Sequence, residues 1–151
     1  MNTALQVLHR PIVSVFILLF VLFYPMLVSI YVFLPLTIGI IGYIMILGIE
    51  ERRFYYILIS ILYFINLEVN LSLPFFLNII SVLIIYAMFY HNLGHFKKCQ
   101  ICKPIILVVL IDFIYLGILI SYDFIFQTIS VKLDYILLYS LIVDMLVVII
   151  L

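Results

Sequence analysis

Four potential metal ligands form the densest cluster of chemically reactive side chains in this sequence. His91, His95, Cys99 and Cys102 lie within twelve residues of one another. Two imidazoles and two thiolates can complete a tetrahedral zinc site. The spacing does not match a standard zinc finger, so three hypotheses stay open: a zinc or other soft-metal site, a redox-active pair of thiols, and ordinary loop residues. The ordinary loop is favoured, and no cofactor other than such a zinc ion is expected.

Two aspartates form a second candidate site, because each lies near the middle of a long apolar stretch. No Lys or Arg lies at a similar depth to pair with Asp112 or Asp144. A carboxylate at the centre of a membrane helix costs about 2.5–3.5 kcal/mol on insertion scales, so it should face other helices. If the two acids approach one another, one should stay protonated through like-charge repulsion. Proton or cation coupling and recognition of a partner helix are the functional hypotheses, whereas a neutral Asp bound to a neighbouring Tyr or Ser is the favoured structural one.

A third group of polar residues surrounds one predicted turn and consists of Asn66, Glu68, Asn70 and Asn78. These side chains could line a small polar pocket that opens to the outside. A hydrated corner between two helices is the more common arrangement. Ser72 is expected to cap the following helix, with Pro74 in its first turn.

The elements that must position these residues are predicted to be membrane-spanning helices. Of 151 residues, 70% are hydrophobic and 9% are charged, whereas a soluble domain has about 45–50% apolar and about 25% charged residues. Each apolar segment is close to the ~20 residues that a helix needs to cross a bilayer. We therefore expect a single domain over residues 1–151, an all-α integral membrane bundle of six transmembrane helices, at 11–30, 31–49, 54–70, 73–90, 104–122 and 134–151.

The distribution of basic residues predicts that both ends of the chain lie in the cytoplasm. Lys and Arg concentrate in short cytoplasmic loops of membrane proteins. With the N-terminus inside, only Lys132 falls outside, and the other six basic residues fall inside: Arg10, Arg52, Arg53, Lys97, Lys98 and Lys103.

Several classes of function lack support in the sequence. Seven basic and seven acidic residues leave no net charge, so no nucleic-acid partner is expected. The chain contains no G-x-S-x-G, Walker or H-E-x-x-H motif, so no enzymatic activity is expected.

The layout of the chain resembles the MreD family of bacterial rod-shape proteins. The resemblance rests on the short length, the six segments, the small loops and the corner from Glu68 to Pro74, followed by Phe75-Phe76-Leu77-Asn78. It implies a multi-pass protein of the bacterial cytoplasmic membrane with a role in cell shape. MreD proteins in turn resemble the six-helix substrate-binding subunits of vitamin importers. Cys99 and Cys102 depart from the family and resemble small bacterial inner-membrane proteins with a C-x-x-C loop.

Two functional hypotheses follow from these patterns. The first is a non-enzymatic inner-membrane subunit that acts through helix contacts in a larger assembly related to cell shape or cell-wall synthesis. Its partners would be the lipid bilayer and a membrane protein or a second copy of the chain. The second is a small transporter or substrate-binding membrane component that uses Asp112 and Asp144.

Overall fold

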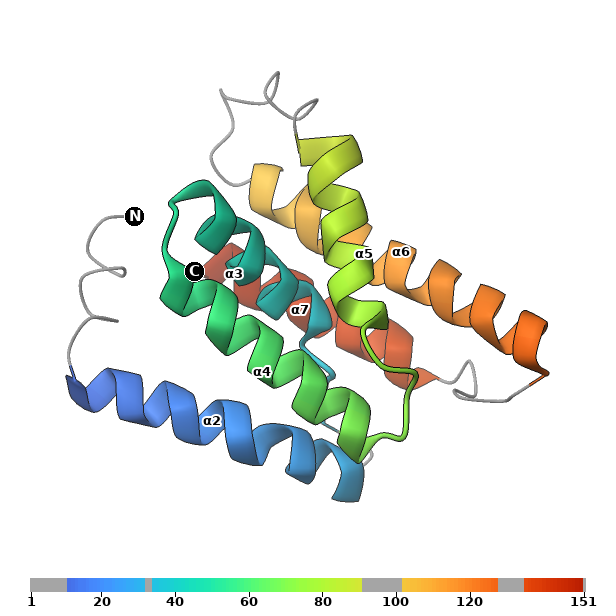
Figure 1. Cartoon of the computed structure of the whole chain (residues 1–151), viewed down its shortest axis with the longest axis horizontal. Coiled ribbons are helices and arrows are strands. Elements are labelled where there is room, and N and C mark those ends of the chain that lie inside the picture. Colours follow the sequence, from blue (N-terminus) through green and yellow to red (C-terminus); the bar gives the residue numbers. More distant parts are fainter. Residues whose placement is uncertain (1–10, 32–33, 91–101, 128–134, 151) are drawn as a thin grey trace.

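The computed structural model describes residues 11–31, 34–90, 102–127 and 135–150, which form helices joined by short connections (Figure 1). The helices are α2 (Pro11–Ile30), α3 (Ile38–Glu50), α4 (Phe54–Asn70), α5 (Leu77–Ile85), which continues into the π-helical turn η1 (Tyr86–Tyr90), α6 (Cys102–Phe126) and α7 (Tyr135–Ile150). No strand occurs among the described residues. The predicted all-α fold is therefore confirmed for this part of the chain.

Helix α3 lies among the other helices. It contacts α4, α5, α6 and α7, while α2 packs against α4 at the side of the bundle (Figure 1). Helices α5 and α7 also pack against α6. The two helices that carry the aspartates, α6 and α7, are therefore neighbours, and both reach α3.

Each helix corresponds to one expected segment, but two helices begin later than predicted. Helix α3 begins at Ile38 rather than at residue 31, because Pro35 lacks a backbone donor and disfavours helical geometry in the residue before it. Helix α5 begins at Leu77 rather than at residue 73, and its N-cap is Phe76. The prediction that Ser72 caps α5 is therefore wrong.

Ser72 instead ends α4. Its backbone is left-handed, with a φ of 52°. The Ser72 N–H binds the Val69 carbonyl at 3.3 Å, and the Leu73 N–H binds the Glu68 carbonyl at 2.9 Å, which are the two hydrogen bonds of a Schellman motif. Arg52 has a φ of 54° and ends α3 in the same way. Both turns satisfy carbonyl groups at a helix end.

Apolar side chains form both the interior and much of the exterior of the bundle. Every helix except α3 has exposed large apolar side chains, which agrees with the central place of α3. Of the described helices, α6 is long and apolar enough to cross a membrane, judged by length and composition, and the other apolar stretches are 10–17 residues long. The residues with no exposed surface include Ile46, Tyr63, Phe64, Leu67, Ile85, Leu107 and Ile111.

Candidate functional site

The first turn of α3 lies inside the bundle, where residues 34–37 lead into it; we call these residues the leading segment. Residues 35–37 are not helical. Thr37, the N-cap of α3, has a left-handed φ of 51° and makes no capping hydrogen bond through its side chain. Backbone groups without helical partners must be satisfied elsewhere, above all where water is excluded. Their partners here are side chains of other helices.

Three hydroxyl groups bind the backbone of the leading segment. The Tyr24 hydroxyl on α2 donates to the Pro35 carbonyl at 2.8 Å, and the Tyr63 hydroxyl on α4 donates to the Leu36 carbonyl at 2.9 Å. The Ser140 hydroxyl on α7 accepts the Leu36 N–H at 3.0 Å. Three helices therefore meet at one short stretch of backbone.

Asp144 caps α3 from α7. Its Oδ2 accepts the Gly39 N–H at 2.9 Å, and its side chain is completely buried. The N–H groups of a first helical turn have no partner within the helix, and the positive end of the helix dipole favours an anion there. Asp144 follows Ser140 by one helical turn, so a single face of α7 supplies both contacts to the start of α3.

Asp112 reaches the same glycine from α6. A β-carbon built on Gly39 would lie 2.9 and 3.0 Å from the two carboxylate oxygens of Asp112 and 2.7 Å from Val108 Cγ1. Glycine at this position therefore allows the close approach of α6 to α3. Since Asp144 binds the N–H of Gly39, the two carboxylates lie within roughly 8 Å of each other, given ordinary backbone dimensions. The structure thus brings together the two acids that the sequence analysis singled out.

Each aspartate has one buried oxygen without a hydrogen bond. Within the described part of the chain, Asp112 Oδ2 and Asp144 Oδ1 have no partner, although buried polar atoms are normally paired. None of the six expected segments contains a Lys or Arg that could neutralise the acids. Two ionised carboxylates accept hydrogen bonds but cannot donate, whereas a proton makes one of them a donor. Proton binding is therefore a chemistry that this pair of carboxyl groups can perform.

Glu68 and Asn78, two of the four predicted corner residues, contact each other and cap α5. Glu68 Oε2 accepts the Phe76 N–H at 2.7 Å. Glu68 Oε1 accepts the backbone N–H of Asn78 at 3.0 Å and its side-chain amide at 3.1 Å. Both side chains are buried. A carboxylate at the end of α4 thus satisfies donors at the start of α5, the role that the sequence analysis assigned to Ser72.

The other two corner residues, Asn66 and Asn70, belong to a separate group of hydrogen bonds. The Asn66 amide donates to the carbonyls of Val21 and Leu22 on α2, at 3.1 and 2.8 Å. The Asn70 amide donates to the backbone and side-chain oxygens of Asn66, both at 2.7 Å. The predicted corner is therefore divided between an α4–α5 contact and an α2–α4 contact.

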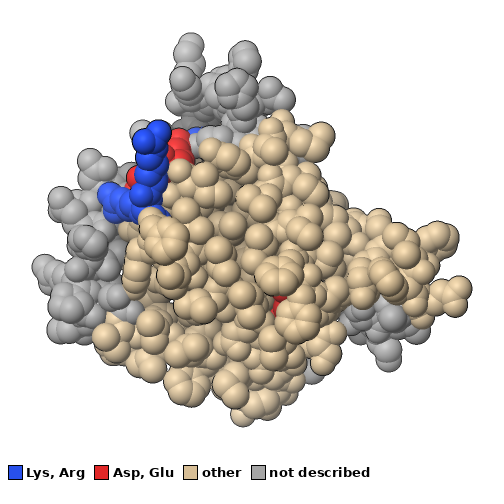
Figure 2. Space-filling view, viewed as in Figure 1, with Lys and Arg blue, Asp and Glu red and all other residues tan. Residues whose placement is uncertain are grey.

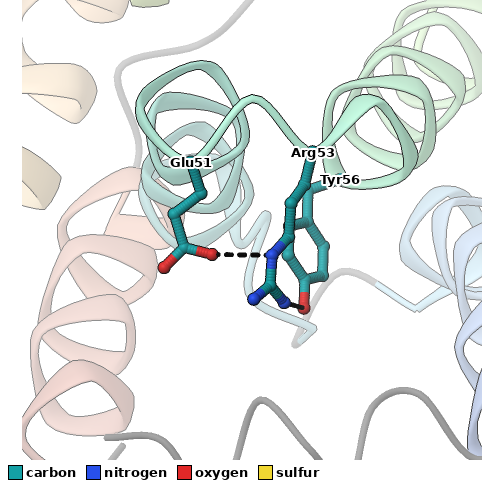
Figure 3. A network of polar contacts seen from close by, with 3 residues as sticks. All are labelled: Glu51, Arg53 and Tyr56. Atoms are coloured by element: carbon teal, nitrogen blue, oxygen red, sulfur yellow. Dashed lines mark hydrogen bonds and ion pairs between the residues drawn. The ribbon is translucent and has the colours of Figure 1, made fainter.

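The charged turn between α3 and α4 lies at one end of the bundle (Figure 2). Arg53 Nε lies 3.0 Å from Glu51 Oε2, and the Arg53 guanidinium donates to the Tyr56 hydroxyl at 3.4 Å (Figure 3). Lys103 Nζ lies 3.6 Å from Glu50 Oε1, which places the start of α6 at the same end. Solvent-exposed ion pairs contribute about 1 kcal/mol or less. These ion pairs therefore contribute little to the stability of this end of the bundle.

The loop with four potential zinc ligands lies mostly outside the described residues, because His91, His95 and Cys99 are not among them. Cys102 is the first residue of α6 and is disulfide-bonded. Over the described ranges, no group of three or more His, Cys, Asp or Glu residues could hold a metal ion. The zinc site stays a prediction.

The sequence analysis missed the hydroxyl groups that complete the site at the start of α3. The sequence could have placed Ser140 at this site, because Ser140 precedes Asp144 by four residues on an apolar helix and so lies on the same helix face. Tyr24 and Tyr63 had no comparable signal, since their contacts depend on which helices pack against the leading segment. The search of known proteins adds no further residue to the site: no family model, no curated protein and no solved structure matches the chain.

Proposed function

We propose that the chain is a multi-pass protein of the bacterial inner membrane that acts without catalysis, as a subunit bound through helix contacts in a larger assembly. The distribution of polarity carries this proposal. Buried polar side chains bind one another or the backbone, while large apolar side chains cover much of the exterior. In lipid, every backbone polar group needs a partner within the protein. The hydroxyl groups around the leading segment supply such partners.

Six spans with both ends in the cytoplasm are the arrangement that we propose. Helix α3 has 13 residues and so a length of ~20 Å, shorter than the ~30 Å hydrocarbon core. The leading segment and α3 together would therefore form the second crossing. The Lys103–Glu50 pair places the start of α6 beside the turn that carries Arg52 and Arg53, and basic residues that share one end support a cytoplasmic side.

Helix α2 is the helix best placed to contact a partner. It packs against α4 at the side of the bundle (Figure 1). A partner would be a second membrane protein or a second copy of the chain. The resemblance to MreD proteins suggests an assembly for cell shape or cell-wall synthesis. Between residues 15 and 30 of α2, the exposed large apolar side chains are Val15, Phe16, Leu18, Leu19, Phe20, Leu22, Phe23, Met26, Leu27 and Ile30.

The partner-binding role of α2 can be tested by changing shape without changing polarity. Lipid solvates any apolar side chain, whereas a partner helix packs against particular shapes. Joint replacement of Phe16 and Phe23 by Leu should leave membrane abundance unchanged but fail to restore cell shape in a deletion strain. Phe113→Leu, at an exposed position on α6, is the matched control and should restore it.

Cell aspect ratio by microscopy and membrane abundance by immunoblot are the measurements. Full restoration of shape by the double variant would show that these α2 side chains do not bind the partner. A deletion strain with unchanged shape would exclude the role in cell shape itself.

A small transporter or substrate-binding membrane component is the second candidate, and the arrangement of Asp112 and Asp144 around Gly39 favours it. A coupled transporter needs a carboxyl group that gains and loses a proton. Asp112→Asn and Asp144→Asn should then preserve membrane abundance but abolish transport. In a purely structural subunit, the same variants should retain function in the cell.

A further inference from the structure

The first turn of α3 favours one negative charge beside it over two, because two carboxylates there would repel each other. A helix N-terminus carries roughly half of a positive elementary charge. Asp144 already uses the Gly39 N–H, so Asp144 is the acid placed to be ionised. Asp112 packs against the same glycine from the opposite helix. A second carboxylate there would be a largely unpaired charge away from water, which is costly.

We propose that Asp112 and Asp144 bind one proton as a pair, with Asp112 as the neutral acid and Asp144 as the carboxylate. The proton turns an Asp112 oxygen into a donor, and Asp144 Oδ1 is a buried acceptor without another partner. We infer that this proton lies between Asp112 Oδ2 and Asp144 Oδ1, the two buried oxygens without another partner. Asp112 is less buried than Asp144, so it is the member of the pair through which the proton exchanges.

Among the residues that the structure describes, the groups around the pair supply no competing charge. Tyr24 on α2 and Tyr63 on α4 are the titratable side chains near Asp144, and both hydroxyls donate to backbone carbonyls of the leading segment. Helix α3 presents backbone N–H groups, and α5 has no ionisable side chain between Leu77 and Ile85. A metal cation is disfavoured because the positive end of α3 would repel it.

This inference deepens the transport candidate, and it rests on the proposed placement of the two aspartates within a membrane. The site itself can be examined without any transport assay. Infrared spectroscopy distinguishes a carboxylic acid from a carboxylate by the carbonyl stretch, and it can be applied to the purified full-length chain in lipid nanodiscs at neutral pH.

The wild-type protein should show one carboxylic-acid band that shifts in heavy water. Asp112→Asn and Asp144→Asn should each abolish the band, because the remaining carboxyl group takes the one negative charge that α3 accommodates. Asp123→Asn, on the same helix as Asp112, is the matched control and should keep the band.

Three results would overturn the shared proton. No acid band in the wild type would mean two carboxylates, and a band that each variant only halves would mean two independent acids. Loss of the wild-type band when Na⁺ or Li⁺ replaces K⁺ would mean a metal site, and this measurement needs no variant to fold. An acid band together with Asn variants that keep full function in cells would contradict the transport candidate while leaving the proton site intact.

Discussion

At the scale of single residues, Pro25 and Asn66 show how one helix compensates for a missing hydrogen bond in another. Pro25 lies inside α2 and has no N–H, so the Val21 carbonyl four residues earlier loses its helical donor. The Asn66 amide on α4 donates to that carbonyl at 3.1 Å. Asn66, which the sequence analysis placed in a polar corner between two helices, is thus a partner of the backbone next to a proline.

We expect Asn66→Leu to destabilise the protein, and to do so less when Pro25 is also replaced by Ala. An interhelical hydrogen bond in a membrane protein contributes ~0.6 kcal/mol on average and up to ~1.7 kcal/mol. An alanine at position 25 restores the N–H that binds Val21, so Asn66 is no longer needed. A double-mutant cycle of unfolding free energies in mixed micelles measures the coupling. Equal losses in the two backgrounds would show that Asn66 does not compensate for the proline.

The residues of the candidate site were only partly predictable from the sequence. Asp112 and Asp144 stood out because charges are rare in the apolar segments, and the structure brings them to one glycine. The role of Ser140 was not predicted, because its partner is the Leu36 backbone. The spacing of four residues from Asp144 could have placed Ser140 on the same face of α7, but its partner can be recognised only once it is known that residues 35–37 leave the helix.

At the scale of elements, two helices are capped by an acid from another helix. Asp144 caps α3 across a separation of 105 residues, and Glu68 caps α5 across 10 residues. Sequence signals for a helix start rely on a capping residue directly before the helix. Hydropathy therefore indicated where the helices lie, whereas the starts of α3 and α5 were predicted too early.

The start of α3 also depends on the absence of a side chain at Gly39, which Gly39→Ala tests. Its β-carbon would meet Val108 Cγ1 at 2.7 Å and the Asp112 carboxylate at 2.9 Å. Overpacking lowers the unfolding free energy by about 1–3 kcal/mol. The better helix propensity of alanine raises it by at most about 1 kcal/mol. We expect a net loss in unfolding free energy, measured in mixed micelles.

Gly117→Ala is the matched control for this substitution. Beyond its chain neighbours and the backbone of its own helix, no atom lies within 4 Å of a β-carbon at Gly117, so the same change should leave stability unchanged or raise it. A Gly39→Ala variant as stable as Gly117→Ala would show that α6 does not pack tightly against the start of α3.

At the scale of the whole molecule, the positions of the charged side chains lead to a test of orientation. Two exposed turn residues lie at opposite ends of α4: Arg52 just before the helix and Ser72 just after it. In a background without Cys99 and Cys102, a membrane-impermeant maleimide should label Ser72→Cys but not Arg52→Cys in intact cells. Both should react after permeabilisation, which controls for access. The opposite pattern would invert the proposed topology.

Composition predicted the apolar exterior of the bundle, because a chain with 70% hydrophobic residues has more apolar surface than one core can bury. Composition could not predict which helices pack against one another. The central place of α3 follows from its contacts with four other helices and from glycines at which those helices approach closely. Pairing between helices depends on shape, to which hydropathy is insensitive.

The contacts between α3 and α7 bear on biosynthesis. Leu36 and Gly39 donate to Ser140 and Asp144 across separations of 104 and 105 residues, so the ribosome makes the donors long before their acceptors. Until α7 has packed against α3, the start of α3 carries backbone N–H groups without these partners, which would be costly in the proposed membrane environment. A chain interrupted before residue 135 therefore retains a defect at its centre. Unsatisfied N–H groups at the start of α3 thus distinguish an unfinished bundle from a finished one.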